Sequence, residues 1–475
     1  MSQSQEATAA PRRRVHDFVC TACGCTCDDL RLTIEGRRII AVEPPCPLAE
    51  KFLLQEVEPP PAACLVDGQP AELDAALERA AEFLSAASAP LVMGFERATT
   101  EAQRLAIEIA DRLGAVLDPT SDQGRSRSHI AVQTAGAVTA TLGEIAARSD
   151  LIVYWNVDPA TTHPRHIERF ARRPRTVKDG TQSSRRIITV APERNKTSQA
   201  SDEHLGLGVG SDIAAFAILR ALVKGVSVDA THAEAQTGAP LEQWAYLAQR
   251  LKMAQYAAIF FEPSAREGEA PAEPGSVYRS AVQQEPCPPG SDPAAVSQSI
   301  TELVRELHRY TRAVALRLGD PWNAVSAAQV LTWQTGFPAS VSFTAGFPQY
   351  LPGEASAQVL LERGEVDAVM IIGADPLAQW PKDAANRLAN LPTVVIDNHQ
   401  TETSRAAQVA IFTARFGIET TGSVYRSDGV ALPLRAAVSP QFPEAEVVLE
   451  QLSRQLLLRH SERSEESGNP SLRSG

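Results

Sequence analysis

The sequence predicts an α/β fold, in which a small cysteine-rich β unit precedes parallel sheets covered by helices. From Leu73 onward, helical stretches alternate with short apolar runs such as 91–93 and 151–155. This alternation is typical of strand–helix–strand units, whose parallel sheets are covered on both faces. Five of the seven cysteines lie within residues 20–46, which marks a separate N-terminal unit. With 475 residues, 44% of them hydrophobic, the chain is long enough for two or three cores.

The N-terminal unit carries a candidate metal site. Cys20, Cys23 and Cys27 form a C-x2-C-x3-C run, and Cys46 follows them. Four thiolates suit either zinc or an iron–sulfur cluster. The unequal spacing favours a [4Fe–4S] cluster, because a zinc ribbon usually repeats C-x2-C in both halves; zinc and unmetallated thiols remain as alternatives. Cys25 is left over as a spare thiol.

The elements follow in order along the chain. Apolar positions alternate at 30–34 and again at 39–42 around a Glu-Gly turn, which predicts a β-hairpin. A Pro-rich linker at 58–61 leads into the α/β part. The strands expected there are 91–93, 151–155, 187–190 and 257–261 in the first half, and 313–317, 368–372 and 394–396 in the second half.

A low-complexity stretch divides the two halves. Residues 263–291 are Pro-rich, lack periodicity and contain Cys287, so we expect a surface insertion. Asp292 followed by Pro293 is typical of a helix start, so the second half begins there. The expected parts are a disordered leader at 1–15, a cysteine-rich domain at 16–57, α/β halves at 70–262 and 292–459, the insertion at 263–291 and a disordered tail at 460–475.

Each half also contains an apolar strand followed by a turn that ends in Asp-Pro. These turns run from Asn156 to Pro159 and from Gly373 to Pro376. Turns of this kind lie at the carboxyl edge of a parallel sheet, where nucleotides bind. We therefore expect the halves to pack about a pseudo-twofold axis, with residues 156–163 and 373–381 facing one cleft.

Charge and hydropathy exclude several classes of function. The formal net charge of −12 argues against a nucleic-acid surface, which needs concentrated Lys and Arg. No run of 18 apolar residues is present, so we expect no membrane span. The arginines at 12–14 are not followed by an apolar signal segment, and the cysteine pattern is not a disulfide framework. We expect a cytoplasmic protein.

Four stretches carry a family resemblance: 20–30 (Cys-Thr-Ala-Cys-Gly-Cys-Thr-Cys-Asp-Asp-Leu), 150–166, 346–354 and 417–426. Over about residues 16–430 the chain resembles the B subunits of formylmethanofuran dehydrogenases, of the molybdopterin/tungstopterin oxidoreductase superfamily, and their relative in the bacterial formyltransferase/hydrolase complex. The resemblance implies the formate dehydrogenase/DMSO reductase-like α/β fold, here lacking the C-terminal β-barrel of larger relatives.

The resemblance also implies cofactors. In redox members this subunit carries a [4Fe–4S] cluster and a molybdenum or tungsten ion bound by two pterin guanine dinucleotides, which together reduce carbon dioxide to formate. A Cys or selenocysteine after the strand at 114–116 ligates the metal, and a His follows it. These positions fall at Gly124 and Arg125 in this sequence. Glycine offers no donor atom, and Arg stays protonated, so the pterin-bound metal is expected to be lost.

The nucleotide positions of the family are kept in one half only. After the strand at 187–190 the superfamily usually has an Asp and an Arg that hold a guanine nucleotide, but this chain has Ala191 and Glu193. A glutamate would repel the pyrophosphate. The second half retains the expected types. The cofactor-binding candidates are Asn156, Asp397, His399 and Thr401.

Ordinary structural roles compete with these assignments. His163, His166 and His399 lie near strand ends, where a histidine more often makes structural hydrogen bonds than binds a cofactor. Arg317 matches an active-site arginine of the redox family, but we expect it to pair with a buried carboxylate.

Two functions are left open. In the first, the chain is a structural subunit with no catalytic residue of its own, in a complex with hydrolase, formyltransferase and C subunits that acts on methanofuran-type and tetrahydromethanopterin-type carriers. In the second, it is an active molybdenum- or tungsten-dependent formylmethanofuran dehydrogenase subunit, whose metal is held by the pterins without a protein thiolate. The missing thiol favours the first.

Overall fold

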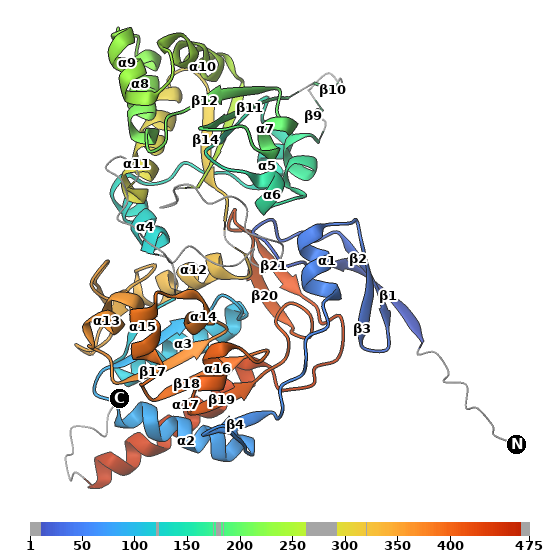
Figure 1. Cartoon of the computed structure of the whole chain (residues 1–475), viewed down its shortest axis with the longest axis vertical. Coiled ribbons are helices and arrows are strands. Elements are labelled where there is room, and N and C mark those ends of the chain that lie inside the picture. The colour runs from blue at the N-terminus through green and yellow to red at the C-terminus, as the bar shows by residue number, and fades with distance from the viewer. Residues whose placement is uncertain are drawn as a thin grey trace, which may run out of the picture.

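The computed structural model describes residues 11–119, 123–173, 175–176, 182–183, 185–262, 292–319 and 321–466. It contains a small N-terminal unit and two α/β units. The α/β units are stacked along the long axis, and the N-terminal unit lies beside the place where they meet (Figure 1). The α/β class and the parallel sheets are therefore as predicted from the sequence.

The N-terminal unit is a three-stranded antiparallel sheet in the order β1 (Arg12–Phe18), β2 (Leu30–Glu35) and β3 (Arg38–Glu43). Helix α1 (Pro47–Leu54) follows it. The predicted hairpin is confirmed, and Gly36 occupies the left-handed region at its turn (φ 61°). The buried face of β2 belongs to the same apolar cluster as the first α/β unit, so the two share a core.

Strand β1 corrects the expected leader. Residues 12–15 were expected to be disordered, but Arg12 to Val15 pair with β2, and the Arg12 side chain binds Glu35 at 2.9 Å. An edge strand is held mainly by its backbone and tolerates charged side chains, which hydropathy does not reveal. Residues 1–10 lie outside the described part of the chain.

The first α/β unit contains a five-stranded parallel sheet in the order β12-β11-β8-β13-β14. Its strands are β8 (Leu151–Trp155), β11 (Arg186–Ala191), β12 (Glu203–Gly206), β13 (Tyr256–Phe261) and β14 (Arg312–Arg317). Its helices are α4 (Gln123–Ala135), α5 (Leu142–Arg148), α6 (Pro159–Thr162), the π-helix η1 (Ile167–Ala171), α7 (Lys196–Ala200), α8 (Asp212–Val223), α9 (Ala230–Thr237), α10 (Leu241–Met253) and α11 (Pro293–Leu307).

The second α/β unit contains a nine-stranded sheet in the order β16-β15-β7-β6-β17-β18-β19-β4-β5, parallel from β7 to β19. Its strands are β4 (Cys64–Val66), β5 (Gln69–Pro70), β6 (Pro90–Gly94), β7 (Val116–Asp118), β15 (Val341–Ser342), β16 (Gln349–Tyr350), β17 (Ala368–Ile372), β18 (Thr393–Asp397) and β19 (Val409–Phe412). Its helices are α2 (Leu73–Ala86), α3 (Thr100–Leu113), α12 (Ala324–Thr335), α13 (Ala357–Arg363), α14 (Pro376–Gln379), α15 (Lys382–Leu388), α16 (Glu402–Ala406) and α17 (Ala445–Glu466).

Two short ribbons complete the described elements. One pairs β9 (Arg175–Thr176) with β10 (Gln182–Ser183), and the other pairs β20 (Gly422–Tyr425) with β21 (Ala431–Leu434). The second ribbon lies between the N-terminal unit and the second α/β unit (Figure 1).

The sheet order corrects the expected division at 70–262 and 292–459. Strand β6 pairs in parallel with β17, so residues 64–118 belong to the second unit. Strand β14 pairs with β13 and so belongs to the first unit. Buried parallel strands are apolar throughout, so composition does not reveal which sheet a strand joins. The expected insertion, 263–291, lies outside the described residues.

The expected disordered tail, 460–475, is also corrected in part. Helix α17 continues to Glu466 and packs on α2 and α3. Its buried face begins earlier, with Val448, Leu449, Leu452 and Leu456. Extending an existing helix is far less costly than starting one, so polar residues can continue it. Residues 467–475 are not described.

A buried arginine ties together the end of α5 and the end of η1. The last carbonyl groups of a helix lack intrahelical donors, so they need other partners. The guanidinium of Arg185 supplies these donors and is buried. It donates to the carbonyl oxygens of Ile145 (3.4 Å), Ala146 (2.6 Å), Ser149 (2.8 Å), Phe170 (2.9 Å), Ala171 (2.7 Å) and Arg173 (3.2 Å).

Arg185→Ala is therefore expected to lower the free energy of unfolding by about 3 kcal/mol, because several buried carbonyl groups lose their donor. Arg185→Lys should recover only part of this, since an ammonium group cannot span the same acceptors. The control is Arg454→Ala, which removes an exposed pair with Glu450 (3.7 Å) and should cost less than about 0.5 kcal/mol. Denaturant unfolding of the full chain measures both, and equal losses would contradict the assigned role.

Candidate functional site

The cysteine loop, residues 20–29, contains three of the four predicted ligands, Cys20, Cys23 and Cys27. The backbone N–H of Cys20 donates to the carbonyl of Cys27 at 2.8 Å, which closes the loop. Cys46 stands at the start of α1, and all four candidate ligands are buried. Burial raises the pKa of Cys20, and the neighbouring charges of Cys23, Cys27 and Cys46 raise it further. Each of the four thiols thus lies close enough to affect another.

The surroundings shift the pKa values of the thiols in different directions. A hydrogen bond with Cys25 lowers the pKa of Cys23 to about 6, against the opposing effect of burial. Burial raises the pKa of Cys27 to about 11, although Arg169 acts in the opposite direction. The surroundings of Cys23 thus favour its thiolate, which is the form that ligates metals.

The surroundings of the loop suit an anionic cluster. Among the described residues, the hydroxyls of Thr21 and Thr26 and one guanidinium nitrogen of Arg169 are buried and have no hydrogen-bond partner. Such donors commonly serve cluster sulfurs. In the part of the chain that the structure describes, no three His, Cys, Asp or Glu side chains are arranged around a single ion. A four-iron cluster spreads its cysteine ligands more widely than one ion does, and the residues present fit that donor set.

Two ion pairs dock the cysteine loop on the first α/β unit. Arg165 donates to both carboxylate oxygens of Asp29, each at 2.7 Å, and Arg169 donates to Asp28 at 2.7 Å. Hydrogen bonding by Arg165 lowers the pKa of Asp29. The Arg165 side chain is only 5% exposed, so its charge depends on this partner.

The same loop also contacts the second α/β unit. The backbone N–H of Trp322 donates to the carbonyl of Thr21 at 2.9 Å, and that of Ser427 donates to Gly24 at 3.0 Å. Gly417 lies so close that a Cβ there would be 2.4 Å from the Thr21 hydroxyl oxygen. The cysteine loop is therefore the point where all three units meet.

The two strand-end turns have the same backbone. Asn156 and Gly373 both adopt positive φ, at 51° and 58°. Each donates its backbone N–H to the neighbouring strand, Asn156 to Val190 at 2.7 Å and Gly373 to Ile396 at 2.9 Å. The predicted similarity of the two turns is confirmed. Helices α6 and α14, which follow the turns, lie on the sides of the two units that face each other in Figure 1.

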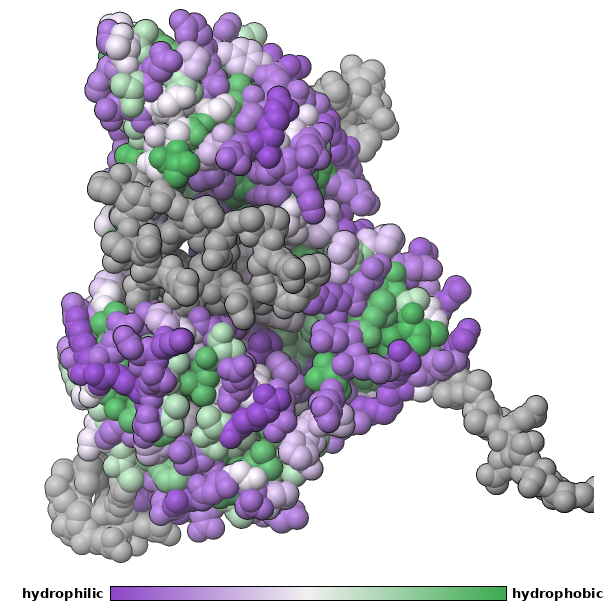
Figure 2. All heavy atoms as spheres, viewed as in Figure 1, coloured by the Kyte–Doolittle hydropathy of each residue, from purple (hydrophilic) through white to green (hydrophobic). Residues whose placement is uncertain are grey.

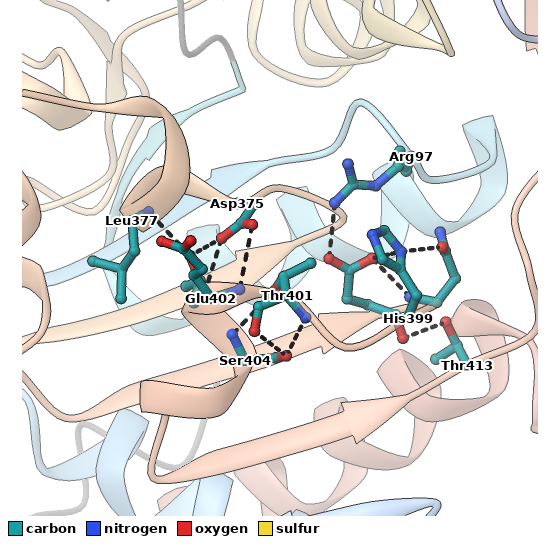
Figure 3. A network of polar contacts seen from close by, with 11 residues as sticks. Arg97, Asp375, Leu377, His399, Thr401, Glu402, Ser404 and Thr413 are labelled. Carbon is teal, nitrogen blue, oxygen red and sulfur yellow. Dashed lines mark hydrogen bonds and ion pairs between the residues drawn. The ribbon is translucent and has the colours of Figure 1, made fainter. Parts of the chain in front are cut away.

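Each turn is fastened by its aspartate. Asp158 accepts from the backbone N–H and hydroxyl of Thr197 at 2.9 and 2.5 Å. Asp375 accepts in the same way from Thr403 at 2.9 and 2.6 Å (Figure 3). Both carboxylates are thus used within the fold, to hold a turn against the next helix.

Most of the cofactor-binding candidates of the second unit make internal bonds. Asp397 accepts from Arg97 at 2.9 Å, and Thr401 caps α16 by accepting from the N–H of Ser404 at 3.1 Å. The ring of His399 lies 2.8 Å from the Asn398 amide oxygen and beside Arg97 and Asp397 (Figure 3).

Two adjoining cavities border this region, and His399 lines both. Their volumes are about 560 and 380 Å³, and both are lined by Asn398, Arg415 and the linker residues 55–58. Burial lowers the pKa of Arg415. Among the described residues, its guanidinium has no acceptor within hydrogen-bonding distance. This side of the second unit therefore offers positive charge to an anion, as a nucleotide phosphate requires.

In the described part of the first unit, the corresponding residues do not form a matching arrangement. At the end of β11, Ala191 is buried and Glu193 is exposed. Asp212, which follows a Gly-rich segment, accepts from the Trp155 ring N–H at 2.7 Å and is thereby occupied. Gly124 is the second residue of α4, and the side chains of 123–127 lie outside the described residues. With no thiol in this segment, the residues do not fit a metal bound by a protein ligand and two dinucleotides.

The other histidines and Arg317 have local partners. The His163 Nε2 lies 2.9 Å from the Gly319 carbonyl, and its Nδ1 lies 2.9 Å from the Thr162 hydroxyl. Arg317 pairs with Glu262 at 2.8 Å, so the carboxylate partner is confirmed, but Glu262 is half-buried and not buried as predicted.

Several functional residues were not predicted from the sequence. The His-Pro-Arg-His segment contains Arg165, but nothing near it in the sequence indicates that it pairs with Asp29. No motif identifies Arg169 or the cavity residues Arg97 and Arg415. The Asp-Asp pair after Cys27 was the only local signal for a basic partner.

Comparison with known proteins identifies the family of the chain. Residues 74–444 match the molybdopterin oxidoreductase family, and the chain belongs to this family. It is 30% identical to the B subunit of tungsten-containing formylmethanofuran dehydrogenase 2 of Methanocaldococcus jannaschii, over 91% of this chain and 97% of that protein. It is 27% identical to the B subunit of the formyltransferase/hydrolase complex of Methylorubrum extorquens, over 81% and 94% respectively. The resemblance inferred from the motifs is confirmed.

Comparison with solved structures agrees with this family assignment. The formyltransferase/hydrolase complex of Methylorubrum extorquens with methylofuran contains a chain that matches with a TM-score of 0.66 and 26% identity, over 84% of this chain and 99% of that one. Acetylene hydratase from Pelobacter acetylenicus shares the fold with a TM-score of 0.60 at 13% identity, over 94% of this chain and 69% of that one. In the described residues, no helix has the length and apolar character to cross a membrane.

A double-mutant cycle tests the docking of the cysteine loop. Arg165→Ala and Asp29→Ala should show a coupling energy on the order of 1 kcal/mol near pH 7, because the pair is bidentate and its arginine is buried. The control pair is Arg31 and Glu43, 3.5 Å apart and more than half exposed, for which less than about 0.5 kcal/mol is expected.

The pH dependence of this coupling has a definite sign. Because the folded pKa of Asp29 is lowered from 3.8, the coupling is present above that value and is lost as the pH falls through the lowered pKa. Equal coupling for the two pairs, or a coupling that grows on acidification, would contradict the docking role.

Proposed function

We propose that the chain is the B subunit of a formyltransferase/hydrolase complex of the formylmethanofuran dehydrogenase type, and that it is a structural subunit whose redox centre has been lost. The observation that carries this proposal is the segment 117–129, where Gly124 and Arg125 occupy the family's metal-ligand and histidine positions. A subunit without a metal ligand has no redox transition state to stabilise.

The two nucleotide regions support the same proposal. In the first unit Glu193 replaces a residue type that binds phosphate, and Asp212 is bonded to Trp155. In the second unit His399 and Arg415 still line cavities. In redox members the metal is bound by two pterin guanine dinucleotides. If the first unit no longer binds its dinucleotide, the second unit alone would not hold the metal in that way, and redox chemistry would be lost.

The role that remains is assembly with partner subunits. The proposed partners are the hydrolase, formyltransferase and C subunits, which act on methanofuran-type and tetrahydromethanopterin-type carriers in the cytoplasm. Hydrophobic side chains are visible over the N-terminal unit on the face drawn in Figure 2, and the α/β units also expose large ones such as Met253, Trp333 and Phe347. Apolar surface of this kind is typical of subunit contacts.

The cysteine site is proposed to be kept. Cys20, Cys23, Cys27 and Cys46 would hold a [4Fe–4S] cluster, which supplies one-electron transfer in redox members and would have a structural role here. The buried donors of Thr21 and Arg169 described above support this assignment.

A second function is favoured by one comparison. The identity to the tungsten-containing subunit is 30% over 91% of the chain, against 27% over 81% for the formyltransferase/hydrolase subunit. This alternative is an active molybdenum- or tungsten-dependent formylmethanofuran dehydrogenase subunit, with its metal held by the pterins alone.

Metal and pterin analysis of the anaerobically purified complex separates the two functions. We expect about four irons per chain and no molybdenum, tungsten or pterin. Cys46→Ala should lose the iron because one ligand is missing, whereas the control Cys64→Ala, a buried thiol in β4, should keep it. Molybdenum or tungsten near one per chain would overturn the structural role, and an iron-free wild type would overturn the cluster.

Replacing Gly124, Arg125, Ser126 and Arg127 together by Ala is expected to leave formyl transfer and hydrolysis by the assembled complex nearly unchanged, because the segment carries no chemistry. A contrasting variant, Arg165→Ala, should reduce co-purification of the partners by loosening the cysteine loop. A fall of about a hundredfold in activity for the loop variant, with assembly intact, would correspond to about 2.7 kcal/mol of transition-state stabilisation and would rule out the structural role.

A further inference from the structure

Cys25 is the thiol that the four-ligand site does not use. It is 1% exposed, although it stands in the same loop as the candidate ligands. Its sulfur lies 3.8 Å from Nδ1 of His166, and Cys23 stands two residues before it in the same loop. Cys25 therefore lies between a candidate cluster ligand and an imidazole from the first α/β unit.

His166 is held in a closed aromatic surrounding. The residue is 0% exposed, and its ring meets those of Tyr154, Phe170 and Phe260 with centroids 5.8, 5.5 and 4.6 Å away. Its backbone N–H donates to the His163 carbonyl at 2.7 Å, which fixes the segment. Within the described residues, Nε2 has no hydrogen-bond partner, so the polar contact of the ring is the one at Nδ1 with Cys25.

We propose that Cys25 and His166 are positioning residues that orient and polarise Cys23 as a cluster ligand through a hydrogen-bond relay. The inference rests on the proposed cluster site and adds to it two residues that touch no iron. A thiol has one proton to donate and a sulfur that accepts weakly. In the relay, Cys25 donates its proton to the Cys23 sulfur and accepts from the Nδ1–H of His166. Hydrogen bonds to ligand sulfurs are a recognised means of tuning a cluster.

A purely packing role explains these contacts less well. A free buried cysteine behaves as a small apolar side chain, and its neighbours are then apolar. Cys25 instead contacts a polar group, the imidazole of His166. Burying an imidazole costs free energy unless it is hydrogen-bonded. The contact of the His166 ring with the Cys25 sulfur offsets part of this cost.

The test uses the full chain, reconstituted anaerobically with ferrous iron and sulfide. The readouts are bound iron and the midpoint potential of the cluster, followed by electron paramagnetic resonance. Cys25→Ala should bind as much iron as wild type but titrate at a more negative potential, because the Cys23 sulfur loses its donor. Cys25→Ser, which keeps a donor, should return toward the wild-type potential. Cys64→Ala removes a buried thiol from another core and should change neither readout.

Variants of His166 test the second half of the relay. His166→Phe should shift the potential in the same direction as Cys25→Ala, and His166→Gln, which keeps a donor, should shift it less. An unchanged potential in Cys25→Ala with full iron would overturn the relay while leaving the cluster site in place. Loss of iron in Cys25→Ala, as in Cys46→Ala, would make Cys25 a ligand and also overturn it. A wild type that binds no iron would overturn the cluster site, and the relay with it.

Discussion

The docking of the cysteine loop is the constraint on which the rest of the structure depends. Asp29 binds Arg165 of the first α/β unit, while the loop carbonyl groups accept from Trp322 and Ser427 of the second. A buried guanidinium is costly without a partner, so Arg165 is compatible with the folded state only when the loop is in place. Because the chain enters the second unit, passes through the first and returns, the loop also joins segments that are distant in sequence.

Features set by neighbouring residues could be predicted, and features set by distant ones could not. The hairpin around Gly36 and the two Asp-Pro turns depend on local backbone preferences, so the sequence indicates them directly. The sheet that β6 or β14 joins depends on pairing with strands that are equally apolar, so no residue type distinguishes the two sheets. The ion pair between Asp29 and Arg165 spans 136 residues, and neither member has a local pattern that identifies the other.

The two strand-end turns show why a shared motif does not define a shared function. Asp158 and Asp375 fasten their turns with the same bonds, so the backbone at both sheet edges is alike. The difference lies in the side chains beyond the turns. Asp212 is bonded to Trp155 in the first unit, whereas Arg415 in the second faces a cavity with no acceptor among the described residues. The capacity to bind an anion therefore depends on these outer residues and not on the motif.

A similar separation exists between the contacts that stabilise the fold and the family's metal-ligand positions. Arg185 and the turn aspartates make contacts within each α/β unit, and the cysteine loop joins the units, whereas the ligand positions fall at Gly124 and Arg125. A ligand thiol is required for its chemistry, and its replacement need not remove any of these contacts. Under the proposed structural role, the chain would therefore keep its fold without the metal ligand, and that fold would still present the same surface to partner subunits.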